Sequence, residues 1–216
     1  MLDRGLGLEF VRQISQDSSN TVIATTRSMS SDLSDLKKVS EPNGKNTHIL
    51  ECNTGDLESI KKFVSEVGSK LSGTKINYLL NNAGQNSVPD QTSLTIEPKD
   101  LMHEITVNVI GPAKTTQFLL EARLLAPDVR IMNMTSGLGS MKVSLGIEPR
   151  KCATYSISKA ALNSLTVQQS GEVPKRLGGE AVVICMDPGW VKTRMGGEGA
   201  ILEAEESVSL TMLCAA

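Results

Sequence analysis

The chain is poor in the residues that build metal centres and disulfide frameworks. Its 216 residues include two histidines, His48 and His103, and neither has a second ligand type at metal-binding spacing. A metal site is therefore not expected. We expect the cysteines to be small apolar core residues of a protein from a reducing compartment. There are four of them, widely spaced and without a Cys-x-x-Cys pair: Cys52, Cys152, Cys185 and Cys214.

Long apolar runs and an excess of one charge are also absent. No stretch approaches the ~20 apolar residues of a membrane helix, and the first residues do not resemble a signal peptide. Lysine and arginine number 22 against 24 acidic residues, for a formal net charge of −2 and no basic stripe. An electrostatic nucleic-acid binder would need such a stripe. We therefore expect a cytoplasmic protein with neither a membrane nor a nucleic acid as partner.

What the chain does contain is a regular alternation of short β-branched runs and longer helical ones. The length suits one α/β domain, over residues 1–216, and is too short for two. Strict alternation implies parallel strands with right-handed crossovers, and hence a doubly wound parallel sheet, the Rossmann fold. The expected strands are 21–26, 47–50, 76–80, 129–134 and 181–186, and the expected helices are 6–13, 31–39, 56–67, 99–123 with a bend near Gly111-Pro112, and 155–169.

The expected first strand of this architecture is missing from the sequence. Arg4-Gly-Leu-Gly7 opens a helix with two glycines, which let a backbone approach a pyrophosphate at the helix N-terminus. Such a turn normally follows a central strand, for which there is no room before Gly5. Losing even about 400 Å² of apolar burial costs about 10 kcal/mol. We therefore expect the chain as written to be aggregation-prone or inactive. The two glycines by themselves would also fit a simple turn that binds no phosphate.

Several polar or glycine-containing segments follow the expected strands, where ligands bind in open α/β sheets. Asn81-Asn-Ala-Gly84 permits close backbone approach, and Ser136 ends another strand. Asn108 lies inside a helix although asparagine is a poor helix former. Pro188-Gly189 follows the last strand. Each feature alone has an ordinary explanation as a turn or a strand end.

Tyr155-Ser-Ile-Ser-Lys159 carries the strongest chemical signal. A spacing of four places both side chains on one helix face, with Cβ atoms ~5–6 Å apart. The free tyrosine pKa is about 10, and a neighbouring ammonium is expected to lower it toward the range useful for proton transfer. A chance pair on an exposed helix is the alternative. The second tyrosine, Tyr78, lies in an apolar strand and has no lysine at this spacing.

Taken together and in this order, these motifs resemble those of the short-chain dehydrogenase/reductase family over nearly the whole chain. The segment 188–197, Pro-Gly-Trp-Val-Lys-Thr-Arg-Met-Gly-Gly, is similar to the carbonyl-reductase-like branch related to sniffer and C-factor proteins. The resemblance implies an NAD(P)-dependent oxidoreductase that transfers a hydride between a nicotinamide and a small-molecule carbonyl or alcohol.

The resemblance also implies roles for four residues. Tyr155 would be the general acid/base and Ser136 would orient the carbonyl. Lys159 would tune Tyr155 and hold the nicotinamide ribose, and Asn108 would support a water chain. The expected cofactor-binding residues are Arg4, Gly5, Leu6, Gly7, Arg27, Asn53, Asn82, Ala83, Gly84, Tyr155, Lys159, Pro188, Gly189, Val191 and Thr193.

Two arginines decide the expected cofactor. Arg27, after the second expected strand, and Arg4, in the glycine turn, suit the bidentate contacts of a 2′-phosphate. NADP is therefore favoured over NAD, although the charge of Asp3 would oppose the phosphate.

The chain also departs from the family pattern. Met1 stands where the first turn glycine is expected, and Asn53 replaces a usual aspartate. Ser136 and Tyr155 are 19 positions apart, so the loop 137–150 is extended, and the chain stops at Ala216 within an expected helix. These departures suggest truncation at both ends. They leave open an inactive Rossmann domain that acts as a binding or dimerisation partner, and a homo-oligomer.

Overall fold

The structure, a computed structural model, describes residues 4–215, with side chains for residues 4–213. Met1, Asp3 and the side chain of Cys214 lie outside the described part. The strands are β1 (Val22–Thr26), β2 (Thr47–Glu51), β3 (Ile76–Asn81), β4 (Leu125–Met134) and β5 (Val182–Met186). The α-helices are α1 (Gly5–Ile14), α2 (Ser34–Ser40), α3 (Leu57–Leu71), α4 (Pro98–Ile105), α5 (Gly111–Glu121), α6 (Met141–Ser144), α7 (Ala153–Leu177) and α8 (Ala204–Ala215). Shorter turns are η1 (Glu41–Asn46), η2 (Thr106–Ile110) and η3 (Gly137–Gly139).

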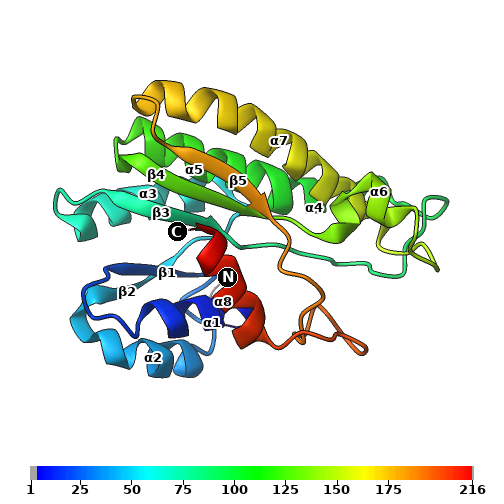
Figure 1. Ribbon diagram of the computed structural model, residues 1–216, viewed down its shortest axis with the longest axis horizontal. Helices are drawn as coiled ribbons and strands as arrows, with labels where there is room; N and C mark the ends of the chain where they lie inside the picture. The colour runs from blue at the N-terminus through cyan, green and yellow to red at the C-terminus, as the bar shows by residue number, and fades with distance from the viewer. Residues whose placement is uncertain (1–3, 216) are drawn as a thin grey trace.

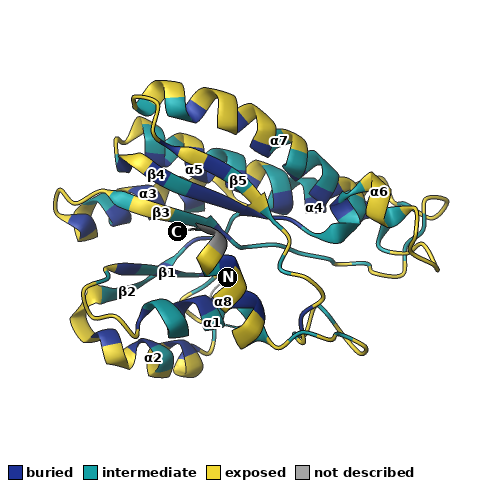
Figure 2. Ribbon diagram, viewed as in Figure 1, coloured by how far each residue is buried: buried dark blue, intermediate teal, exposed yellow. Residues whose placement is uncertain are grey.

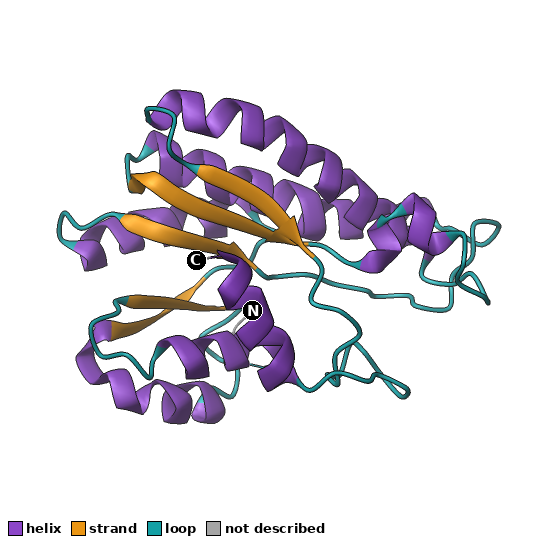
Figure 3. Cartoon of the chain, viewed as in Figure 1, coloured by secondary structure: helices purple, strands orange, loops and turns teal. Residues whose placement is uncertain are grey.

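The strands are all parallel, but they form two sheets (Figures 1 and 3). One sheet has the order β1-β2 and the other has the order β3-β4-β5. In Figure 1, β1 and β3 are the neighbouring strands of the two sheets, and no ladder joins them. Within residues 4–215 no strand precedes α1. The doubly wound α/β prediction is confirmed, and β1 and β3 each keep one edge without a ladder partner among the described strands.

Two helices hold the sheets together from opposite faces. On one face, Phe10 of α1 packs with Met132 of β4 and Val208 of α8, while the next residue, Val11, packs with Ala24 of β1. On the other face, Ile60 of α3 belongs to a core cluster that also includes residues of β2 and β4. Figure 2 shows this buried layer between the helices and the strands. These contacts between helices and strands, and not a strand ladder, therefore join the sheet β1-β2 to the sheet β3-β4-β5.

Local hydrogen bonds explain where two of the helices begin. Asp56, the first residue of the expected helix 56–67, caps α3 by accepting a hydrogen bond from the backbone of Glu58 at 3.0 Å. Leu57, however, is exposed and does not belong to the buried face of that helix. Helix α2 begins at Ser34, later than expected, because the Asp32 side chain accepts a hydrogen bond from the Ser34 backbone outside the helix.

The bounds of three other elements differ from the expected ones. The expected helix 99–123 is interrupted by the π-helical turn η2 just before Gly111. Strand β4 begins at Leu125 because that residue pairs with Ile76 ahead of a register shift. Helix α7 runs past Pro174 to Leu177, because Val173 and Leu177 pack on the core beneath it.

The expectation that the cysteines are buried core residues holds for only one of those described. Of the described cysteines, Cys52 is buried, Cys152 is half-buried and Cys185, on the edge strand β5, is exposed. Tyr78 is 55% exposed, because α1 and α8 cover the later residues Leu80 and Met132 on this face of the sheet. No helix within the described residues is long and apolar enough to cross a membrane.

Candidate functional site

The candidate site lies where the parallel strands end. Ser136 follows β4, Asn82 and Gly84 follow β3, and Pro188 follows β5. The carboxyl ends of parallel strands share one edge of the sheet, which is the usual ligand-binding edge. Helices contribute the other predicted catalytic residues, with Asn108 in η2 and Tyr155 and Lys159 in α7.

The Tyr155 side chain is buried beside the end of β4. Burial is the main cause that raises the pKa of Tyr155, to about 12, and the nearby Asp187, Glu104 and Cys152 act in the same direction. A hydrogen bond with the Ser136 hydroxyl lowers this pKa. The Ser136 hydroxyl also accepts a hydrogen bond from the Leu138 backbone at 3.2 Å, which fixes it at the start of η3.

Lys159 is buried next to Tyr155 but does not lower its pKa as predicted. The Lys159 Nζ lies 5.6 Å from the centroid of the tyrosine ring and donates a hydrogen bond to the Met134 carbonyl at 2.6 Å. Burial lowers the pKa of Lys159 itself to about 8, against the effect of the Glu104 charge. Desolvation is therefore the largest influence on the pKa of both groups, because each lies in the protein interior. It favours the neutral phenol of Tyr155 and weakens the ammonium of Lys159.

Asn108 is buried and fully engaged in hydrogen bonds. Its Oδ1 accepts from the Gln85 backbone at 2.8 Å, and its Nδ2 donates to the Gln85 carbonyl at 2.8 Å and to the Ser158 hydroxyl at 2.9 Å. The π-helical turn places it there, as such turns often do at functional sites. A Cβ added at Gly84 would lie 3.3 Å from the Lys159 Nζ and 3.7 Å from the Asn108 Oδ1. The loop after β3 thus meets both residues, and only glycine leaves this space open.

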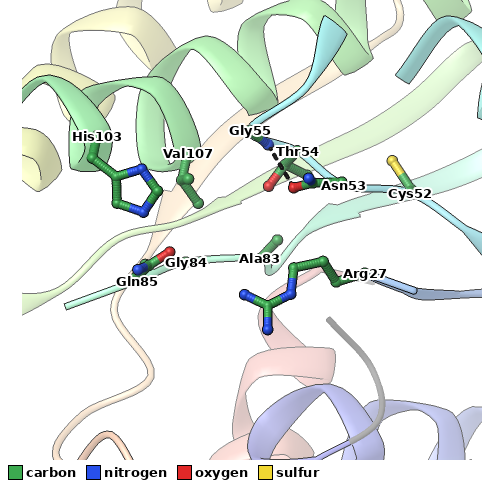
Figure 4. Close-up of a pocket in the computed structure, with 10 residues that line it drawn as sticks. All are labelled: Arg27, Cys52, Asn53, Thr54, Gly55, Ala83, Gly84, Gln85, His103 and Val107. Atoms are coloured by element: carbon green, nitrogen blue, oxygen red, sulfur yellow. Dashed lines mark hydrogen bonds between the residues drawn. The ribbon is translucent and has the colours of Figure 1, made fainter. Parts of the chain in front are cut away.

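A cavity of about 160 Å³ opens between the ends of β1, β2 and β3 (Figure 4). Four predicted cofactor residues line it: Arg27, Asn53, Ala83 and Gly84. Sequence reasoning missed six further lining residues: Cys52, Thr54, Gly55, Gln85, His103 and Val107. Most of them lie next to a predicted site residue in the sequence, and this adjacency was the signal that could have found them. His103 had no such signal, and it lies one helical turn before Val107 on the same wall of the cavity.

The glycine turn and the loop after β5 lie against each other. Gly5 has a φ of 55°, and a Cβ added there would lie 3.4 Å from Thr193 Cγ2. The predicted phosphate turn therefore meets the segment predicted for the nicotinamide end. Leu6 and Val191 point elsewhere, since the Leu6 side chain packs on the core and Val191 is buried. These two residues offer backbone groups only.

Comparison with known proteins agrees with this architecture. The chain matches the short chain dehydrogenase family over residues 2–200. It is 30% identical over 206 residues to the short-chain dehydrogenase/reductase atnB of Arthrinium sp., covering 88% of this chain and 72% of that protein. It is also 30% identical over 134 residues to C-signal of Myxococcus xanthus, covering 62% of this chain and 76% of that protein.

Solved structures are similar over nearly the full length. The NADPH-bound carbonyl reductase from chicken fatty liver superposes with a TM-score of 0.88 at 30% identity, covering 99% of this chain and 87% of that one. The carbonyl reductase Sniffer of D. melanogaster gives a TM-score of 0.87 at 25% identity, covering 100% and 88%. The chain therefore belongs to the short-chain dehydrogenase/reductase family of NAD(P)-dependent oxidoreductases.

Proposed function

We propose that this protein is an NADP-dependent carbonyl reductase in which Tyr155 exchanges a proton with the substrate oxygen. One observation carries the proposal: Ser136, Tyr155 and Lys159 meet at the carboxyl edge of the sheet, with Asn108 behind them. A protein used only for binding has no need of a buried lysine beside a buried tyrosine, because burying an amine disfavours its charge.

The residues present fit a nicotinamide cofactor. Gly84 leaves open the space in front of Lys159 and Asn108, and Gly5 brings the N-terminus of α1 against Thr193. The first turn of a helix offers backbone N–H groups and a positive dipole to a pyrophosphate. When bound, the cofactor supplies the hydride that adds to the carbonyl carbon.

The side chains then have separate tasks. Ser136 donates a hydrogen bond that orients the carbonyl oxygen, and Tyr155 transfers its phenolic proton to that oxygen. The raised pKa of Tyr155 keeps the proton on the phenol at neutral pH. Below its pKa of about 8, Lys159 is an ammonium that offers donors to the ribose and helps to replace the proton lost by Tyr155. Asn108 holds the Gln85 backbone in place behind this pair.

Arg27 supports NADP as the cofactor. It is exposed at the end of β1 and lines the cavity opposite His103 (Figure 4). A guanidinium binds phosphate in bidentate fashion, and a structural relative is described as bound to NADPH.

The test is consumption of NADPH or NADH, followed optically with a panel of aldehydes and ketones, by the purified chain and by its Tyr155→Phe variant. We expect NADPH oxidation that depends on a carbonyl compound and on Tyr155. Binding of NADPH without any turnover would instead support the second candidate, a catalytically inactive Rossmann domain that serves as a binding or dimerisation partner. The free edges of β1 and β3 are the observation that favours this candidate.

A further inference from the structure

A buried carboxyl group near Tyr155 has no part in the mechanism above. Glu104, in α4, has a side chain with 0% exposure. It lies one helical turn before Asn108, so both residues face the same side. Its Oε1 accepts a hydrogen bond from the Ser87 backbone at 2.7 Å, while Asn108 holds Gln85 two residues earlier. Glu104 and Asn108 thus hold the same loop, at Ser87 and Gln85, from one face of the helix.

The other oxygen of Glu104 has no comparable partner. Oε2 is buried without a hydrogen bond of normal geometry, and so is the hydroxyl of Thr154. Thr154 immediately precedes Tyr155 and is itself fully buried. An interaction of the Thr154 hydroxyl with the Glu104 carboxyl lowers the pKa of Glu104. This contact links α4 to the residue that precedes Tyr155 in α7.

Titratable groups on two helices interact electrostatically with Glu104. From α4 they are Asp100 and His103, and from α7 they are Tyr155 and Lys159. Burial raises the pKa of Glu104, and the Ser87 hydrogen bond opposes this. The Glu104 charge in turn raises the pKa of both Tyr155 and Lys159.

We propose that Glu104 is a positioning residue of this site, which holds the loop at Ser87 and presents a buried carboxyl to the first turn of α7. The carboxyl keeps the proton on the Tyr155 phenol and on the Lys159 amine at higher pH than either group would otherwise hold it. This role rests on the proposed function for its purpose, although its electrostatic part can be measured without turnover.

The chain offers a direct measurement because it has only two tyrosines. In a Tyr78→Phe background, Tyr155 is the sole phenol, and its ionisation is read by ultraviolet absorbance after stopped-flow pH jumps, before alkaline unfolding. Glu104→Gln keeps the shape of the side chain and removes its charge. We expect it to lower the Tyr155 midpoint by about half a pH unit or more. Glu104→Asp should largely restore the midpoint.

The matched control is Glu172→Gln, which removes the same charge from an exposed position farther along α7. It should leave the midpoint unchanged. With NADPH and a carbonyl substrate, Glu104→Gln should also move the alkaline decline of kcat to lower pH, with little change in KM. A folded Glu104→Gln variant whose Tyr155 midpoint equals that of the parent would overturn the proposal.

Three further outcomes are also decisive. If Glu104→Gln does not fold, Glu104→Asn is measured against Glu104→Asp in the same way. If neither neutral variant folds while Glu104→Asp does, the carboxyl serves only the stability of the fold and the proposal is wrong. If the parent chain reduces no carbonyl compound, the proposed function fails, but the absorbance titration still decides the role of Glu104.

Discussion

The two sheets of this protein carry different parts of the site and hold them differently. Beside the sheet β3-β4-β5, Asn108, Tyr155 and Lys159 are buried, and each is tied to neighbouring groups. Beside the sheet β1-β2, Arg27 is exposed at the rim of a cavity. In the proposed function this difference separates two tasks: the larger sheet would position the proton transfer, and the smaller one would contact the distal part of the cofactor.

The interior of the larger sheet explains why it can position side chains well. Asn81 of β3 donates a hydrogen bond to the Asn133 side chain of β4 at 2.9 Å. Asn133 in turn donates to Thr166 and Gln169 of α7, each at 2.9 Å. Satisfied buried networks of this kind specify one arrangement of the elements that they join. The network therefore holds α7, with Tyr155 and Lys159, against the strand that ends at Ser136.

The largest expected effect concerns the free edges of β1 and β3. A strand needs ladder partners and covered faces, and about 400 Å² of lost apolar burial costs about 10 kcal/mol. We expect the chain as written to be aggregation-prone or inactive, and a variant extended by about ten residues that add a β-strand before α1 to be soluble and active. Hydrogen exchange should be faster in β1-β2 than in β3-β4-β5.

Thermal unfolding checks this expectation. A single cooperative transition near that of ordinary relatives, with stabilisation by NADPH, would mean that helix packing alone closes the sheet. If the 216-residue chain is too unstable for assay, the variants described below are compared in the extended chain.

The next largest effect is expected at Tyr155. Replacement by phenylalanine removes the proton donor and only one of the many expected cofactor contacts, so turnover should fall ~10²–10⁴-fold while the Kd for NADPH stays nearly unchanged. Tyr78→Phe, at an exposed position of β3, is the matched control and should keep full activity. Retention of more than about a tenth of the turnover by Tyr155→Phe would contradict the assignment.

A stability experiment sharpens the contrast between the two halves. Asn133→Ala leaves Asn81, Thr166 and Gln169 without their common partner, so we expect a loss of about 2–4 kcal/mol in the free energy of unfolding. Asn46→Ala removes one exposed hydrogen bond, to the Ser18 carbonyl, and should lose about 1 kcal/mol or less. Urea unfolding measures both, and equal losses would mean that the network adds no stability to the larger sheet.

The smallest effect is expected at Arg27. If its guanidinium binds a 2′-phosphate, Arg27→Ala should weaken NADPH binding by about 1.5–3 kcal/mol and leave NADH binding nearly unchanged. Fluorescence titration with both cofactors makes the comparison, with Lys37→Ala of α2 as an exposed control. The same loss for NADH as for NADPH would show that Arg27 is structural and that NADP is the wrong cofactor.

The sequence by itself determined the order of the elements, the parallel sheet and the identity of the residues that meet at its edge. These rest on local rules: periodicity marks strands and helices, Asp56 caps α3, and a spacing of four places Tyr155 and Lys159 together.

Only the tertiary structure decided what depends on burial and on contacts between distant segments. It showed that desolvation, and not Lys159, controls the pKa of Tyr155, since burial in a low-dielectric interior has no local sequence signal. It placed His103 at the cavity and Glu104 in the interior, because the neighbours of both residues come from other elements. It also carried α7 past Pro174, since packing of Val173 on the core outweighs the local preference of proline.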